Sequence, residues 1–550
     1  MYSALKYHVN NDQKMISKKR IRVMTIHVTR IFFTLLFLFQ LILGHAQNMA
    51  IGSFEDHYLR NLQLLGLADN DISFSVRPLS RDLYKAEHGD SLLNQFSSLR
   101  KLSGNRRLYS HGLHFDYEGN SSRPFSWNNG TMLNAKGSQF RVSSGLLFKS
   151  KVLTVNFSPE FMNAANKTYE FSSYYGNPTA EKYNKFFPGQ SYIQFNLGKK
   201  VGIGYSNENL WWGPGQFNSL LMSNNAPGFG HLFLSSRAPI KTPIGSFEWQ
   251  LISGGLDQDS LMSSEVYHQQ IAPYTRKWRY LNSILISYQP RFLPGMFLGF
   301  SRNVQFYGNF ADTLRTGFLK NYLPIVAAFL EKKINTQQGL INEKDYRDQQ
   351  AAVFMRYVMP KSKFEFYFEY GFNDFKDNLR DLIVDAQHSA AYIIGFKKIV
   401  SLSSKRFYSI SGEVTQMGQS ADFTVRNAGN WYMHGDVKQG YTHMNQILGA
   451  GSGIGNNLQQ MLVEYFTGPQ KIGIKFQRID YDPARPLTSV NQVWLSPKPW
   501  IDIAVGPTFH RMMQKVGVRG EVMFVNSSNY AWKNKSKFNL STSLNMFYRW

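Results

Sequence analysis

The side chains with the clearest chemical potential lie close together in residues 205–255, where two adjacent tryptophans, Trp211 and Trp212, precede a Gly-Pro-Gly turn at 213–215. Because Gly and Pro break regular structure, this stretch is predicted to be a shaped loop. Its amides donate and accept hydrogen bonds and its carboxylates accept them in pairs, which suits vicinal hydroxyls. A flat indole can cover the apolar face of a sugar ring. The stretch therefore favours carbohydrate binding. The alternative is that the tryptophans pack in a core or at a membrane interface and the asparagines only end turns.

The order of these residues is more specific than their composition. The run NENLWWGPGQFNSLLMSNNAPGFGHLFLSSRAPIKTPIG, residues 207–245, resembles the signature segment of the Wzi family of outer-membrane capsule-assembly proteins. Residues 366–396 and 421–457 resemble further family segments, and residues 56–63 resemble the family's periplasmic N-terminal region. The resemblance implies a lectin-like outer-membrane barrel. Such a protein binds capsular polysaccharide or exopolysaccharide at the cell surface and assists its attachment and assembly, with no enzymatic activity and no cofactor.

The candidate sugar-binding residues are aromatic, amide, acidic, imidazole and basic side chains from these blocks. They are Trp211, Trp212, Asn207, Glu208, Asn218, Asn224, Asn225, His231, Arg237, Lys241, Glu369, Asp374, Tyr432 and His434. Arg237 and Lys241 have no acid between them, so they are the candidates for attracting an acidic polymer. The alternative is a solvated pair or a contact with lipid phosphate.

Two groups of polar residues could suggest other chemistry. Glu365 and Glu369 share a strand face, but four residues of strand separate them by ~13 Å. A two-carboxylate hydrolase needs ~5–9.5 Å, so pairing with Arg in a barrel lumen is the default. The spacings of His434, Asp436 and His443 fit no standard metal site. The sequence predicts neither a catalytic residue nor a metal site.

The chain opens with a basic segment and the apolar run 31–43, which is shorter than the ~20 residues that a membrane-spanning helix needs. With the ending Gly44-His45-Ala46, this predicts a secretory signal peptide over 1–46, so the protein leaves the cytoplasm. The formal net charge is +24, and about +18 without the leader. Export favours anionic glycan, lipid or lipopolysaccharide phosphate over nucleic acid as the partner of this charge.

From about residue 108 the hydrophobic pattern has a period of two. In residues 364–372 aromatic side chains alternate with Glu365, Tyr367 and Glu369. This predicts a strand with one apolar face and one acidic face. Aromatics make up 15% of the sequence. Together these features predict an all-β fold over 108–550, a transmembrane outer-membrane β-barrel of ~18 antiparallel strands. The last strand ends on Trp550 and resembles the signal that barrel-insertion machinery recognises.

Several segments are predicted to be helical. Residues 47–107 are predicted to form a small N-terminal periplasmic unit below the barrel, with a helix at 53–67 capped by Ser53 and a second helical patch at 90–102. Helical inserts at 318–334 and 376–388 are predicted to lie outside the barrel or to plug it. Two alternative functions remain at this stage, namely a passive outer-membrane channel and, less favoured, a surface glycan hydrolase.

Overall fold

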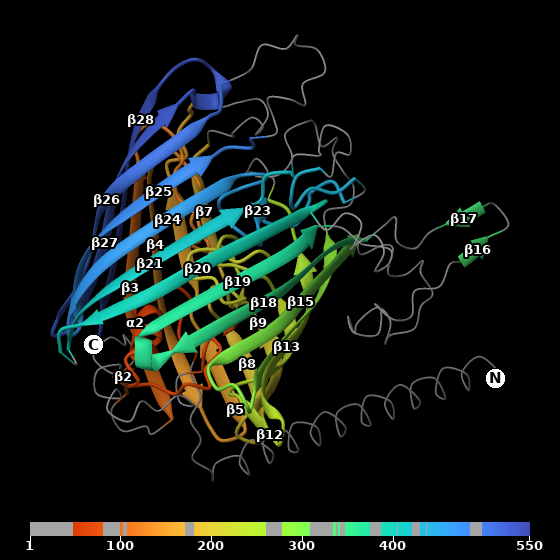
Figure 1. The fold of residues 1–550 in the computed structure, drawn as a ribbon, viewed down its shortest axis with the longest axis vertical. Helices are drawn as coiled ribbons and strands as arrows, with labels where there is room; N and C mark the ends of the chain where they lie inside the picture. Colours follow the sequence, from red (N-terminus) through yellow and green to blue (C-terminus); the bar gives the residue numbers. More distant parts are fainter. Residues whose placement is uncertain are drawn as a thin grey trace, which may run out of the picture. The chain divides into compact units, whose positions relative to one another are not determined.

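The computed structural model describes residues 48–80, 100–102, 107–170, 181–259, 278–307, 334–336, 339–341, 347–373, 387–403, 405–420, 429–435, 437–483 and 498–550. The main compact unit comprises Ala46–Lys149 and Leu153–Trp550. Its dominant element is a closed antiparallel β-barrel of 18 strands (Figure 1). This confirms the predicted fold class.

The barrel strands follow one another in sequence order, and three of them are interrupted, so that β5 with β6, β7 with β8 and β11 with β12 are halves of one strand. The segments are β3 (Leu108–Asn120), β4 (Gly137–Lys149), β5 (Leu153–Phe157), β6 (Glu160–Ala164), β7 (Tyr183–Phe187), β8 (Tyr192–Leu197), β9 (Val201–Ser206), β11 (His231–Ser236), β12 (Ile240–Thr242), β13 (Gly245–Leu256), β14 (Arg279–Pro290), β15 (Met296–Tyr307), β18 (Asp348–Met359), β19 (Phe364–Asn373), β20 (Ala390–Ser401), β21 (Arg406–Gln416), β24 (Asn457–Thr467), β25 (Gln470–Asp480), β26 (Ile501–Met513), β27 (Val516–Ser528) and β28 (Lys537–Tyr548). The last strand pairs with the first, from Ser541↔Asn120 to Tyr548↔Leu113. This seam closes the ring and leaves no unpaired edge.

Alternation along the strands sets the two faces of the wall. In β19 every second residue is buried, and these are the predicted inward residues Glu365, Tyr367 and Glu369. In β26 the outward residues Ile503 and Val505 are exposed. Apolar side chains outside and polar ones inside match a wall that contacts lipid. The predicted direction of the β19 carboxylates is therefore confirmed.

The two ends of the barrel differ in the length of their connections. The connections at 150–152, 198–200, 243–244, 291–295, 360–363, 402–405, 468–469 and 514–515 are tight, whereas those between the other strand ends are longer. Tyr548 pairs with Val516, so the C-terminus lies at the short-turn end (Figure 1). Outer-membrane barrels have short periplasmic turns and longer extracellular loops, and the two ends of this barrel differ in the same way.

Two segments fill the barrel interior, and we call them together the plug: residues 48–80 and residues 207–230. The first contains α2 (Phe54–Leu64) and β1 (Val76–Arg77), and the second contains β10 (Trp211–Trp212). Side chains of α2 pack with inward residues of the wall such as Phe407 and Phe466. The loop packs with other inward residues, including Ile252 and Phe354. The lumen therefore holds a hydrophobic core.

Helix α2 confirms the predicted helix but not its place below the barrel. Ser53 Oγ accepts a hydrogen bond from the Asp56 N–H at 3.2 Å, which is the predicted cap. Phe54, Tyr58 and Leu62 form the predicted apolar face, and they pack against the wall from inside. The helix thus belongs to the barrel core, because its apolar face finds more buried surface there.

The remaining described elements are small. They are β2 (Arg100–Lys101), the hairpin β16 (Ile334–Thr336) with β17 (Gly339–Ile341), the hairpin β22 (Thr442–His443) with β23 (Gln446–Ile447), and the 3₁₀ turns η5 (Pro360–Ser362) and η7 (Tyr530–Trp532). The predicted helical patch at 90–102 is wrong at its end, since β2 is extended and pairs with β3. The leader, residues 318–333 and residues 376–386 lie outside the described residues. None of the described helices is both long and apolar enough to span a membrane.

Candidate functional site

The two signature tryptophans are buried inside the barrel. After β9 ends, the chain turns into the lumen and β10 pairs with β1, matching Trp212 to Val76 and Trp211 to Arg77. Trp212 is fully buried and its indole Nε1 donates to Gln250 Oε1 at 2.7 Å. The guanidinium of Arg77 lies over the Trp211 ring, 4.7 Å from its centroid. Of the two alternatives, this geometry supports packing over sugar stacking.

The Gly-Pro-Gly turn lets the loop approach other buried groups closely. Gly213 has φ +100°, and a Cβ there would lie 2.7 Å from Glu369 Oε2. The carbonyls of Pro214 and Gly215 accept hydrogen bonds from Arg60 and Arg77, each at 2.8 Å. A larger residue at 213 would therefore push the loop away from β19 and weaken its docking.

Carboxylates of the wall hold the backbone of this loop. Glu413 accepts hydrogen bonds from the N–H groups of Gln216, Phe217 and Asn218 at 2.8, 3.0 and 2.8 Å. Glu369 accepts one from the Leu220 N–H at 3.1 Å instead of pairing with Arg. Glu365 does pair with Arg, as the default interpretation expected. Glu413 and Glu369 thus satisfy backbone donors that would otherwise be buried without partners.

Most of the other candidate residues also make structural bonds. Asn218 Nδ2 donates to Thr415, Asn225 Nδ2 to the Ile447 carbonyl, and the Tyr432 hydroxyl to the Leu220 carbonyl. His231 is buried with Nδ1 2.8 Å from the Phe229 carbonyl, and Asn207 is half-buried at the start of the loop. These side chains fix the plug in the lumen.

The two basic candidates are not equivalent. Arg237 is buried and donates to Asn196 and Ser80. Lys241 is exposed at the short-turn end, with Nζ 2.7 Å from Asp71 Oδ2. Arg237 is therefore not on a surface that a polymer outside the barrel could reach.

The possible metal ligands do not converge. His434 Nδ1 accepts a hydrogen bond from the Val437 N–H, and His443 Nδ1 accepts one from the Asp257 N–H. Within the described ranges, no group of three His, Asp or Glu side chains is placed to hold a metal ion. Asp374 and Asp436 lie outside those ranges.

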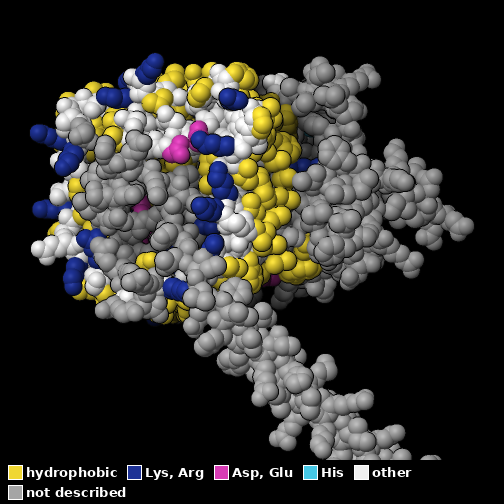
Figure 2. Space-filling model, turned by 90° about the horizontal axis from the view of Figure 1, so that it is seen from below, with side chains coloured by type: hydrophobic (Ala, Val, Ile, Leu, Met, Phe, Trp, Pro, Cys, Tyr) yellow, Lys and Arg dark blue, Asp and Glu magenta, His cyan; other side chains and the backbone are white. Residues whose placement is uncertain are grey.

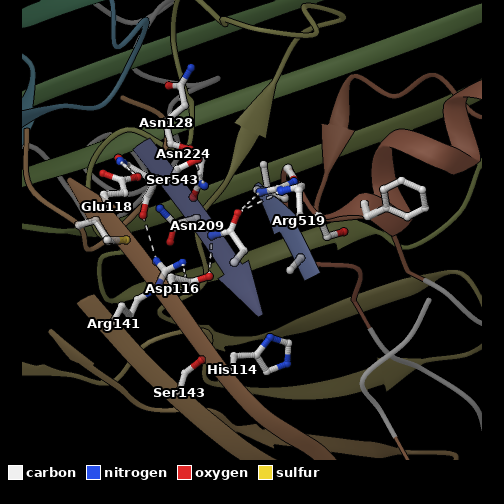
Figure 3. A pocket seen from close by; sticks show the side chains of 18 of the residues that line it. His114, Asp116, Glu118, Asn128, Arg141, Ser143, Asn209, Asn224, Arg519 and Ser543 are labelled. Carbon is white, nitrogen blue, oxygen red and sulfur yellow. Dashed lines mark hydrogen bonds and ion pairs between the residues drawn. The ribbon is translucent and has the colours of Figure 1, made fainter. Parts of the chain in front are cut away.

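A cavity of about 450 Å³ lies between the plug and the strands on both sides of the barrel seam (Figure 3). We call it the seam cavity. Its lining includes residues of β3, β4, β27 and β28, plug residues, and Trp127 from the connection after β3. Of the predicted site residues, only Glu208 and Asn224 line it. The labelled side chains that point into it are His114, Asp116, Glu118, Asn128, Arg141, Ser143, Asn209, Asn224, Arg519 and Ser543.

Acidic side chains outnumber basic ones in this lining. The carboxyl groups are those of Glu55, Asp116, Glu118, Glu160, Glu208 and Glu521, against the basic groups of Arg141, Lys475 and Arg519. Arg141 Nη2 lies 2.8 Å from Asp116, and Nη1 lies 3.6 Å from Glu160. Glu118 accepts hydrogen bonds from Asn129 and Gln139 at 2.6 and 2.9 Å. The arrangement offers fixed acceptors and amides without a surplus of positive charge.

Comparisons with known proteins decide the family. The model of the family described as capsule assembly protein Wzi matches residues 118–492. The chain belongs to the Wzi family. In fold, this Wzi-family barrel is similar to Wzi of Escherichia coli, described as a carbohydrate-binding β-barrel involved in group 1 capsule assembly. The TM-score is 0.62 at 14% identity, and the match covers 92% of this chain and 100% of that chain.

Other solved structures match with lower TM-scores. OccAB3 of Acinetobacter baumannii matches with TM-score 0.41 and 10% identity, over 80% of this chain and 98% of that chain. OccK7 of Pseudomonas aeruginosa matches with TM-score 0.39 and 8% identity, over 80% and 98%. Among curated protein sequences, none matches this Wzi-family chain.

The seam cavity contains residues that the search for sugar-binding side chains in this Wzi-family sequence did not identify. Asp116 and Glu118 come from β3, Arg141 from β4, and Arg519 and Ser543 from β27 and β28. A usable signal was present in β3, where Asp116 and Glu118 are two residues apart and so share a strand face, as the inward residues Glu365, Tyr367 and Glu369 do in β19. The predicted barrel implies that its first and last strands meet, but nothing in the sequence shows which residues of β3 and β28 lie opposite each other.

A pH-dependent stability is expected from Glu208, which lines the seam cavity of this Wzi-family barrel. Burial raises the pKa of Glu208 to about 8, although Asn48 and Ser206 donate hydrogen bonds to it. A carboxyl with a raised folded pKa stabilises the fold fully below its unfolded pKa, and that stability is lost as pH rises towards 8. Between pH 5 and 8.5, the apparent melting temperature should therefore fall about 2–5 °C more in the unmodified protein than in Glu208→Gln.

The measurement is the temperature at which the compact, heat-modifiable form is lost on a gel, taken at several pH values. Gln keeps the shape of Glu208 and cannot ionise. The Glu208→Gln variant is therefore the matched control for the unmodified protein. Parallel pH profiles for the two proteins would contradict the assignment of a buried, neutral carboxyl at this position.

Proposed function

We propose that this protein binds a capsular polysaccharide at the cell surface and assists its attachment and assembly, and that the seam cavity holds a hydroxyl-rich, uncharged segment of the polymer. Membership of the Wzi family supports the general role. The carbohydrate binding described for the Escherichia coli protein supports the class of ligand. The observation that carries the location is the seam cavity itself, with its amides, carboxylates and an aromatic side chain.

The chemistry of the lining suits sugar hydroxyls. Carboxylates and amide oxygens accept hydrogen bonds from hydroxyls, while Asn and Gln Nδ2 and Nε2 groups donate to them. Trp127 lies edge-on to Phe125, with ring centroids 5.2 Å apart, and both rings line the cavity. Its volume falls in the range of small-ligand sites, which is ~300–1,000 Å³. A short segment of a glycan fits such a site.

The charge of the lining favours a neutral segment over an acidic one. Even with Glu208 neutral, five carboxyl groups against three basic groups would repel a uronic acid, whose own carboxylate would add to the excess. The basic character of the whole chain had suggested attraction of an acidic polymer. The positive charge that carries this character lies elsewhere on the barrel.

Several weak binding sites on the protein can contact one polymer chain at the same time. A polysaccharide repeats its units, so further weak contacts on the long-loop end would raise the overall avidity without any one tight site. The lining of the seam cavity runs from the connection after β3 at the long-loop end to Gly517, next to a short turn. An elongated site of this kind suits a chain-like ligand.

The two alternative functions have less support. The plug fills the interior between the described strands with a hydrophobic core, which does not favour a passive channel. Neither Glu365 nor Glu369 lines the seam cavity, so the pair considered for hydrolysis does not face the candidate site. A test for reducing ends released from purified polysaccharide separates binding from hydrolysis.

Filling the seam cavity should weaken glycan binding. Ser143 and Ser543 point into it from β4 and β28, and replacing both with Phe would occupy the space that the sugar needs (Figure 3). We expect the affinity of the Ser143→Phe/Ser543→Phe variant for neutral polysaccharide to fall by about tenfold or more, or ~1.4 kcal/mol. Binding would be measured calorimetrically with host capsular polysaccharide, and with dextran and polygalacturonate as neutral and acidic probes.

The matched control is Leu544→Phe, at the next position of β28, whose side chain does not line the cavity. It adds a ring on the same strand without filling the site, so binding should stay unchanged. Equal binding by the filled variant and the unmodified protein would place the glycan elsewhere. Tighter binding of polygalacturonate than of any neutral probe would contradict the proposed neutral segment.

A further inference from the structure

A ring of basic side chains surrounds the short-turn end of the barrel, on the opposite side from the long connections. Eight exposed residues form it, and we call them the basic rim: Lys199, Lys200, Arg291, Lys361, Lys405, Arg406, Arg511 and Lys515. The turns at 198–200, 291–295, 360–363 and 514–515 contain no acidic residue. Figure 2 shows Lys and Arg gathered around this face, with few Asp and Glu among them. The seam cavity and its acids play no part in this surface.

The charges of the basic rim are not neutralised by neighbours. Within the part of the chain that the structure describes, none of the eight residues forms an ion pair. Lys200 Nζ donates to the Pro239 carbonyl at 2.8 Å, which leaves its charge uncompensated. At the other end of the barrel, Glu170 pairs with Lys533 and Lys535. The rim is therefore a concentrated positive charge.

Exposed apolar side chains lie directly beside the rim. Phe292 is 84% exposed next to Arg291, and Leu402 is 61% exposed close to Lys405. On the outward face of β26, Phe509 and Arg511 are two residues apart, which is about 7 Å along a strand. Long basic side chains lay their stems along apolar surface and extend the charge to the membrane boundary. The rim thus lies where the lipid-facing belt meets water.

We propose that the basic rim binds the phosphate groups of anionic phospholipids in the membrane leaflet that surrounds the short turns. Charge complementarity selects the phosphate, because a surface of unpaired Lys and Arg next to an apolar belt attracts anionic headgroups. The apolar belt selects a lipid over a soluble anion, since the acyl chains can cover Phe292, Leu402 and Phe509. The rim would fix the depth of the barrel in the membrane and recruit anionic lipid around it.

Native mass spectrometry of the full mature protein in neutral detergent tests this proposal. The protein is mixed with equimolar phosphatidylglycerol and phosphatidylcholine, and the retained lipids are counted. We expect phosphatidylglycerol to be retained in preference, with the preference falling as salt rises. In a variant with Lys199, Lys361, Lys405 and Lys515 replaced by Gln, the preference should fall about fivefold or more.

The matched control replaces four exposed lysines at the long-loop end, Lys167, Lys182, Lys498 and Lys533, with Gln. This variant should keep the preference for phosphatidylglycerol. Heat-modifiable mobility on a gel verifies that each barrel is folded. If the four-lysine rim variant does not fold, the single changes Lys405→Gln and Lys515→Gln should each give a partial loss.

Three results would overturn the proposal. The first is a rim variant that retains phosphatidylglycerol as well as the unmodified protein does. The second is a preference that does not change with ionic strength, since exposed charges are screened over about 8 Å at physiological salt. The third is selective loss of polygalacturonate binding in the rim variant with lipid retention unchanged, which would make the rim a glycan surface. None of these results bears on the seam cavity.

Discussion

Replacing Glu365 with Ala is expected to destabilise the barrel strongly and to loosen the plug. Glu365 is fully buried, with Oε1 2.6 Å from Arg60 Nε and Oε2 3.0 Å from Arg356 Nε. Arg60 belongs to α2 and Arg356 to β18, so one carboxylate joins the plug to the wall. Its removal leaves two buried guanidinium groups without a counter-charge, which costs about 3–5 kcal/mol. Urea unfolding followed by tryptophan fluorescence in detergent measures this loss.

A matched change elsewhere in the lumen should have little effect. Glu521→Ala removes a carboxylate that pairs with Lys475 at 2.9 Å, but these side chains are 29% and 19% exposed. Water can solvate the remaining lysine, so the cost should stay within about 1 kcal/mol. Planar-bilayer recording provides a second readout, because a loosened plug should raise conductance in Glu365→Ala but not in Glu521→Ala. Similar stability and conductance in the two variants would contradict the anchoring role of Glu365.

The second large effect is expected from Trp212→Ala. The Trp212 side chain has no exposed surface, packs in the cluster that includes Leu220 and Ile252, and donates a hydrogen bond to Gln250. Truncation leaves a large void and an unpaired amide, and substitutions of this kind cost about 3–5 kcal/mol. The same unfolding measurement should therefore show a loss comparable to that of Glu365→Ala.

Trp278→Ala is the matched control, since the Trp278 side chain is 46% exposed. Its removal should change the unfolding free energy by about 1 kcal/mol or less. Polysaccharide binding of both variants is measured in parallel. A Trp212→Ala protein of normal stability that no longer binds glycan would restore the sugar-stacking alternative and refute the packing role.

The wall of the barrel could be predicted from the sequence because its pattern is local. Residues 364–372 alternate so regularly that the inward direction of Glu365 and Glu369 follows from the period of a strand. The alternation in the last strand follows from the same pattern. The residues of one strand are enough to indicate which of its faces contacts lipid. These predictions therefore did not depend on knowing which strands pair with it.

The candidate site was harder to predict from the sequence, because its position depends on contacts between segments that are far apart along the chain. Trp211 and Trp212 have the right chemistry for a sugar, but composition does not reveal that their loop turns into the lumen. Glu118 and Ser543 lie opposite each other in the paired strands β3 and β28. They are neighbours only because the ring closes. The cavity that they share could not be inferred from spacing along the chain.

The buried ion pairs of α2 also constrain the order in which the chain assembles. Arg60 bonds to a residue 305 positions later, and His57 bonds to Glu464, 407 positions later. The helix therefore cannot reach its final contacts until most of the wall has been made, and such long sequence separations slow folding. Since Glu365 lies on β19 and Glu464 on β24, α2 can complete its docking only after both of these strands are in place. The N-terminal segment of the plug thus completes its packing late in assembly, although it precedes every barrel strand in the sequence.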